Sequence, residues 1–75
     1  MNKIDKIFYI VFNLKNLKNL NKVTFKNTKK WDSLSHVKFI VALEKAYKIK
    51  IDDEDAMNIL SYNDAIKYLN KINEK

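Results

Sequence analysis

The strongest periodic pattern of apolar positions covers residues 33–47. Apolar side chains recur there at the spacing of one helix face, at Phe39, Ile40, Leu43, Ala46 and Tyr47. Asp32 and Ser33 stand where this helix should begin, and both residue types are good N-caps. The pattern predicts a helix from about Ser33 to Tyr47, with one of these two residues as its cap.

A second apolar line runs along another side of the same predicted helix. It consists of Leu34, Val37 and Val41, at i, i+3 and i+7, and it begins beside Ser33. One interpretation is that a small helical core wraps around these residues. The other is that the line is exposed and docks a partner protein. The pattern by itself leaves both interpretations open.

Three weaker patterns predict further helices. The first helix would run from about Lys3 to Leu14, with an apolar face made of Ile4, Ile7, Phe8 and Val11. A short helix would begin at the acidic run 52–55, because carboxylates complement the dipole at a helix start, and would carry Ala56, Met57, Ile59 and Leu60. The last helix would begin at Ser61, which has Asp64 three positions on, as in a capping box.

Residues 15–31 form a long connection in which strand signals are negligible. Connections of this length without strong structure are often functional. The sum is an all-α chain, a small four-helix bundle with a short third helix and a long loop between the first two helices. Its 75 residues suffice for one domain, so we expect a single domain over residues 1–75.

Composition excludes several classes of function. The chain has no cysteine, which excludes disulfides, thiolate metal sites and a cysteine nucleophile. It has no glycine, which argues against glycine-rich nucleotide-binding loops. Its longest apolar run near the start, residues 7–12, is far short of the roughly 20 residues of a membrane span. We therefore expect a soluble, cytoplasmic chain without stable membrane insertion.

The net charge of +6 is unevenly distributed. Residues 1–31 contain eight lysines and one acid, whereas residues 32–75 contain seven lysines and eight acids. One interpretation is a coding sequence biased toward A and T. Another is a small basic helical module that binds nucleic acid or an anionic membrane through its N-terminal lysines. No basic residue is arginine, so the bidentate arginine contacts of many nucleic-acid readers are missing.

The sequence contains no convincing active site or metal site. His36 is the single histidine, and we interpret it as a surface residue near a helix start. A triad of Ser33, His36 and Asp32 can be written, but nothing indicates an oxyanion hole or a substrate cleft. We expect a protein that is not an enzyme and that binds no metal.

A serine at a helix start is the chemical feature that remains. Unpaired backbone amides and the positive end of the helix dipole favour an anion there, such as a phosphodiester on Ser33. Most serines at this position carry nothing, so the position alone does not assign an attached group.

The triplet Asp32-Ser33-Leu34 and the spacing of the residues after it resemble the acyl carrier proteins. The similarity is good from Trp31 to Leu69 and includes the stretches 49–56 and 61–69. It implies a four-helix bundle with 4′-phosphopantetheine attached covalently to Ser33, and Asp32 matches the family residue before that serine. Acyl groups would be carried as thioesters on the imported thiol, in a specialised lipid, acyl-modification or secondary biosynthetic pathway.

The resemblance also implies partners that dock on the helix after Ser33. These are a phosphopantetheinyl transferase, an acyl-loading ligase, and an acyltransferase or synthase. The surface that would dock them consists of Leu34, Val37, Lys38, Val41, Glu44 and Lys45. We expect a monomer that binds no nucleic acid.

Three departures from the family pattern suggest a dedicated partner set. Residues 29–31 are Lys-Lys-Trp where the family usually has a glycine. The chain is basic, whereas family members are typically acidic. Lys38 and Lys45 stand on the helix that usually presents acids. An aminoacyl or peptidyl carrier, and a carrier-like fold that is never modified, are the alternatives.

Overall fold

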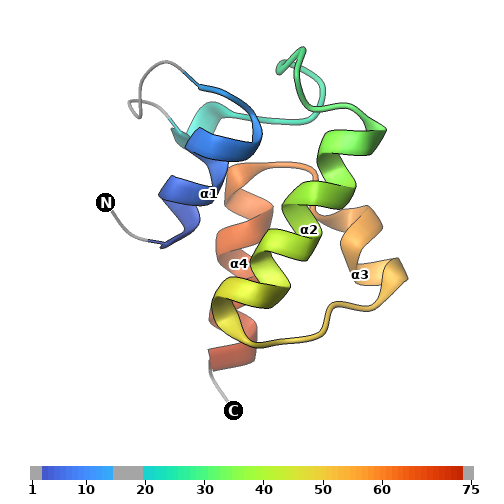
Figure 1. The fold of residues 1–75 in the computed structure, drawn as a ribbon. Helices are drawn as coiled ribbons and strands as arrows, with labels where there is room; N and C mark the ends of the chain where they lie inside the picture. The colour runs from blue at the N-terminus through green and yellow to red at the C-terminus, as the bar shows by residue number, and fades with distance from the viewer. Residues whose placement is uncertain (1–2, 15–19, 74–75) are drawn as a thin grey trace.

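The computed structural model describes residues 3–14 and 20–73. Within them the chain forms four α-helices and one 3₁₀ turn, which are α1 (Lys3–Val11), η1 (Leu20–Lys22), α2 (Ser33–Tyr47), α3 (Asp53–Asn58) and α4 (Tyr62–Asn73). Figure 1 shows the short α3 beside α2, and α1 on the other side of the molecule. The predicted all-α fold, with a short third helix and a long first connection, is confirmed.

Residues at both ends of α2 explain its bounds. Asp32 precedes it with an extended backbone (φ −105°, ψ −175°), and its Oδ1 accepts a hydrogen bond from the Ser35 N–H at 2.9 Å. At the other end Lys48 adopts a left-handed backbone (φ 54°), and its N–H donates to the Glu44 carbonyl. Glycine usually occupies such a position, and this chain has none. The predicted helix is confirmed, and Asp32 is its cap.

The first helix is shorter than predicted, because α1 ends at Val11 and not at Leu14. Asn13 takes a left-handed backbone (φ 51°), and the Leu14 N–H donates to the Tyr9 carbonyl at 3.2 Å. Asparagine tolerates this conformation better than most residues. The apolar pattern continues through Leu14, so periodicity gave no sign of the turn.

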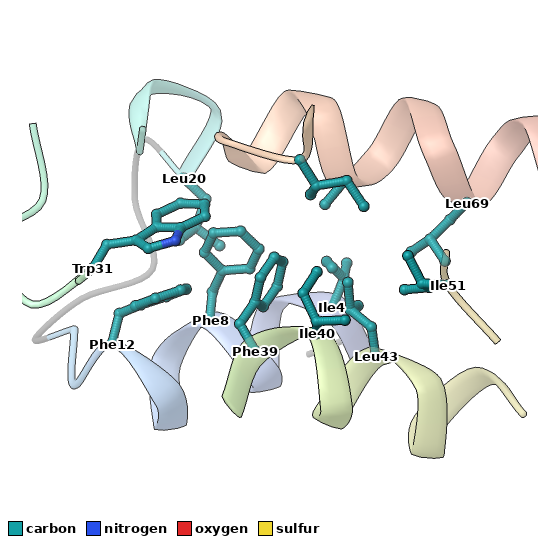
Figure 2. Close-up of a cluster of buried hydrophobic side chains, with 12 residues drawn as sticks. Ile4, Phe8, Phe12, Leu20, Trp31, Phe39, Ile40, Leu43, Ile51 and Leu69 are labelled. Atoms are coloured by element: carbon teal, nitrogen blue, oxygen red, sulfur yellow. The ribbon is translucent and has the colours of Figure 1, made fainter. Parts of the chain in front are cut away.

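Four aromatic rings form one end of the core, from Phe8 of α1, Phe12 of the turn after it, Trp31 of the loop and Phe39 of α2. Trp31 stacks on Phe12 with ring centroids 4.4 Å apart, and Phe8 meets Phe39 edge-on at 4.9 Å. Figure 2 shows these rings together, with aliphatic side chains at the other end of the core. The buried aliphatic residues are Ile4, Leu20, Ile40, Leu43, Ile51, Ile59, Ala65 and Leu69. Burial of Trp31 therefore fixes the chain two residues before Ser33.

An antiparallel bridge ties the long connection to the link between α3 and α4. It pairs Thr24 with Ser61. The Phe25 N–H donates to the Leu60 carbonyl at 2.8 Å, and the Tyr62 N–H donates to the Val23 carbonyl at 3.0 Å. The bridge is isolated in the described part of the chain, which agrees with the negligible strand signals in the sequence.

The last two helices begin as predicted. Three acids, at positions 53–55, occupy the first turn of α3, which ends at Asn58 and so excludes Ile59 and Leu60. The Ser61 hydroxyl oxygen accepts a hydrogen bond from the Asp64 N–H at 2.9 Å, which caps α4. The end of α3 at Asn58 corrects the predicted helix by two residues.

Candidate functional site

Ser33 is the first residue of α2, and its side chain is exposed. Asp32 and not Ser33 caps the helix, so the Ser33 hydroxyl is not needed for capping. No described residue forms a hydrogen bond with that hydroxyl. The structure therefore presents an alcohol at a helix N-terminus that is open to solvent.

The Asp32 carboxylate is held at the start of α2 by backbone amides. The hydrogen bond from the Ser35 backbone N–H stabilises the charged form and lowers the pKa of Asp32 below its ordinary value. Asp32 therefore remains ionised at neutral pH and keeps its capping bond. In this structure its role is to fix the helix start at Ser33.

His36 joins three segments of the fold beside Ser33. The indole Nε1–H of Trp31 donates to Nδ1 of His36 at 3.0 Å. An indole N–H can only donate, so Nδ1 must accept, and Nε2 carries the hydrogen of the neutral ring. Nε2 then donates to the carbonyl of Ala56 on α3 at 2.8 Å. The prediction of a surface histidine is wrong, because His36 is half-buried and links the loop, α2 and α3.

These hydrogen bonds also show that no catalytic triad is assembled. Nδ1 of His36 faces Trp31, whereas the Asp32 carboxylate faces the Ser35 N–H. Neither group is therefore arranged to take a proton from Ser33. The site can present a hydroxyl group for modification by another protein.

A shallow depression of about 350 Å³ adjoins Ser33. Its lining comes from the loop, α2, α3 and the link after α3, and consists of Phe25, Ser33, His36, Met57 and Leu60. Sequence reasoning did not assign Phe25, Met57 or Leu60 to the site. Phe25 and Leu60 meet only through the Thr24–Ser61 bridge, and no local sequence signal indicates that contact. An apolar wall thus stands beside the exposed hydroxyl.

The second apolar line of α2 is exposed. Leu34, Val37 and Val41 leave 66%, 59% and 40% of their surfaces accessible. The core therefore does not wrap around them, and of the two interpretations the exposed one is confirmed. That this line docks a partner stays a prediction.

The charged residues of α2 lie along the two edges of this apolar line. Lys38 and Lys45 are exposed on one edge, because they are seven positions apart on a helix of 3.6 residues per turn. Glu44 lies on the other edge, where its Oε2 accepts a hydrogen bond from the Ile51 N–H at 2.9 Å. The six residues that the sequence predicted for docking therefore share one side of α2.

Known proteins with similar sequences identify the family of this chain. The chain is 38% identical over 73 residues to an acyl carrier protein of Buchnera aphidicola subsp. Schizaphis graminum, and the match covers 97% of this chain and 92% of that protein. This chain belongs to the acyl carrier protein family. It is also 40% identical over 70 residues to an acyl carrier protein of Brachyspira hyodysenteriae, which covers 88% of this chain and 90% of the relative. No protein-family model matches the chain.

A relative from a eukaryote is also similar to this chain. The chain is 44% identical over 48 residues to a putative mitochondrial acyl carrier protein of Schizosaccharomyces pombe, which covers 64% of this chain and 43% of that protein. Acyl carrier proteins are carriers and not enzymes, as the sequence predicted for this chain. Within residues 3–14 and 20–73, no helix is long and apolar enough to cross a membrane.

Proposed function

We propose that this chain carries acyl groups on 4′-phosphopantetheine attached to Ser33. The observation that carries the proposal is the exposed hydroxyl of Ser33 at the start of α2. Asp32 caps the helix, so the Ser33 hydroxyl remains available for attachment of a group. Membership of the acyl carrier protein family supports it. When bound, the group supplies the thiol that a chain without cysteine lacks, and that thiol can hold an acyl group as a thioester.

The residues around Ser33 fit such a group. Ser33 supplies the oxygen for a phosphodiester, and the first amides of α2 favour an anion there by roughly 0.3–1 kcal/mol. Asp32 keeps the helix start in place, and the depression lined by Phe25, Met57 and Leu60 offers apolar surface beside the attachment point. Trp31 and His36 hold the loop and α3 against α2, so the site rests on buried contacts.

The partners would dock on one face of α2, which we call the docking face. It consists of Leu34, Val37, Lys38, Val41, Glu44 and Lys45. A phosphopantetheinyl transferase would modify Ser33, a ligase would load the acyl group, and an acyltransferase or synthase would remove it. The lysines on this face support a dedicated partner set in a specialised lipid, acyl-modification or secondary biosynthetic pathway. We further propose that residues 1–75 act as one monomeric, cytoplasmic domain.

The mass of the protein tests this function directly. Co-expression with a broad-specificity phosphopantetheinyl transferase should add the mass of one phosphopantetheine group to the intact chain. Ser33→Ala should abolish the gain. The matched control is Ser35→Ala, which removes a neighbouring hydroxyl on the same helix turn and should keep the gain.

Two results would argue against the proposal. One is an unmodified wild-type chain after co-expression, and the other is a mass gain that survives in Ser33→Ala. Binding of the unmodified chain to DNA or anionic vesicles, with an affinity that falls steeply with salt and ignores Ser33, would instead favour the basic-module hypothesis.

A further inference from the structure

The docking face carries a row of positive charge next to its apolar line. Lys38 and Lys45 are exposed on the same edge, two helix turns apart. Their ammonium groups have no hydrogen-bond or ion-pair partner among the residues that the structure describes. Both charges are therefore available to a protein that approaches α2.

The single acid of α2 does not balance this charge. The Glu44 carboxylate is half-buried and accepts the Ile51 backbone N–H at 2.9 Å, where it fastens the segment between α2 and α3. Lys48 and Lys50 add two exposed cations at the end of the helix. Along α2, the face near Ser33 thus offers cations and apolar side chains to a partner.

We propose that the enzyme that modifies Ser33 docks here through an apolar patch bordered by Asp or Glu carboxylates. The inference rests on the proposed function and names the chemistry of the partner. Complementary charge accelerates encounter, whereas like charges facing each other disfavour the complex. A transferase with a basic docking surface could not contact Leu34 and Val37 without placing its own positive charges beside Lys38 and Lys45, which would weaken the complex.

The acids of α3 make the surface directional. Asp53 and Glu54 are exposed at the start of α3, and Asp53 and Val41 line the same groove between α2 and α3. Lys50 lines this groove too, so the α3 side of the apolar line carries both signs of charge, whereas the edge with Lys38 and Lys45 carries no acid of α2. The carboxylates of the transferase must face the lysine edge, which fixes how the enzyme is oriented when it reaches Ser33.

The rate of Ser33 modification tests the inference. The probe is the phosphopantetheinyl transferase of the cell that makes this chain, and the measured quantity is kcat/KM. Reversing both charges in Lys38→Glu/Lys45→Glu should lower kcat/KM at least tenfold at about 0.01 M salt, where the Debye length is about 30 Å. This difference in kcat/KM between variant and wild type should disappear at about 1 M salt, where the Debye length is about 3 Å. At low salt the neutral variant Lys38→Gln/Lys45→Gln should have a kcat/KM between those of wild type and the charge-reversed variant.

The matched control is Lys67→Glu/Lys71→Glu, which changes the net charge equally at two exposed lysines of α4, outside the docking face. It should keep kcat/KM within about twofold of wild type. Circular dichroism establishes that all variants keep their helices.

Three outcomes overturn the inference. The first is a Lys38→Glu/Lys45→Glu variant that is modified as fast as wild type or faster. The second is an equal loss of kcat/KM in the α4 control, which would show that the net charge of the chain, and not the docking face, determines the rate. The third is wild-type binding to phosphatidylglycerol vesicles that the Lys38→Glu/Lys45→Glu variant loses while its kcat/KM is unchanged. Failure of the proposed function itself would look different, because wild type would then gain no mass at all.

Discussion

The phenolic hydroxyl of Tyr62 donates a hydrogen bond to Oδ1 of Asp5 at 2.7 Å, and so joins α4 to α1. The ring also meets Phe8 edge-on, with centroids 5.2 Å apart. Burial of the ring, followed by the hydrogen bond to the Asp5 carboxylate, raises the pKa of Tyr62 to about 12. The folded chain therefore favours the neutral phenol.

This contact predicts a loss of stability at alkaline pH. An unfolded tyrosine has a pKa of about 10, so the contribution of Tyr62 is complete below pH ~10 and is lost as pH rises toward about 12. Tyr62→Phe removes the titrating group. We expect urea denaturation to show wild type as the more stable protein at neutral pH, with a gap that shrinks above pH ~10. Subtracting the variant cancels the titration of the lysines and the other tyrosines. A gap that does not change with pH would contradict this account.

A second prediction concerns Trp31. The indole stacks on Phe12 and donates to His36, so Trp31→Ala should lower the free energy of unfolding by about 3–5 kcal/mol. Trp31→Phe keeps an aromatic ring but removes the N–H donor, and should cost about 1–3 kcal/mol. Urea denaturation followed by circular dichroism measures both. A Trp31→Phe variant as stable as wild type would mean that the hydrogen bond to His36 contributes nothing, whereas equal losses in the two variants would mean that the packing of the ring contributes nothing.

The third prediction separates the helix cap from the attachment site. Asp32→Ala should destabilise the chain, because the Ser35 N–H loses its acceptor, whereas Ser33→Ala should change stability by less than about 0.5 kcal/mol. The pKa of Asp32 is lowered in the folded state, so its contribution is present above pH ~4 and is lost as pH falls through the lowered value. Denaturation at neutral and acidic pH measures the loss. An Asp32→Ala variant as stable as wild type at neutral pH would rule out the cap.

The fourth prediction uses the left-handed backbone of Lys48 (φ 54°, ψ 47°). A side chain with a Cβ is strained in this conformation, and glycine is not. Lys48→Gly should therefore raise the free energy of unfolding by up to about 1 kcal/mol. Lys48→Ala is the matched control, because it removes the same charge but keeps the Cβ, and it should give no increase. Thermal denaturation distinguishes the two, and an equal gain in both would assign the effect to charge.

Local patterns were sufficient to predict the bounds of α2 and the start of α4. The apolar spacing from Phe39 to Tyr47 and the acceptor on Asp32 both act within a few residues, so the sequence alone contains them. The same holds for the Ser61 cap of α4. The turn at Asn13 was missed because the apolar helix pattern continues to Leu14, although the left-handed backbone of Asn13 ends the helix before it.

Contacts between distant residues could not be predicted in this way. His36 resembled a surface residue, since its partner Ala56 lies 20 positions away and its partner Trp31 lies in a loop. The exposure of Leu34 was undecided for a related reason, because it depends on whether a distant part of the chain covers that side of α2. Ser33 was predicted as the attachment residue from the family pattern and the helix start, and that assignment stays a prediction.

The pairing of Trp31 with His36 gives this protein an internal optical signal. The chain has one tryptophan and one histidine, and the two rings lie 6.2 Å apart beside the start of α2. Indole emission depends on hydrogen bonding and on access of water. The indole of Trp31, two residues before Ser33, is buried and donates a hydrogen bond to His36. If Ser33 carries the group proposed above, we expect its loading, its unloading and the approach of an enzyme to change the fluorescence of the unlabelled protein.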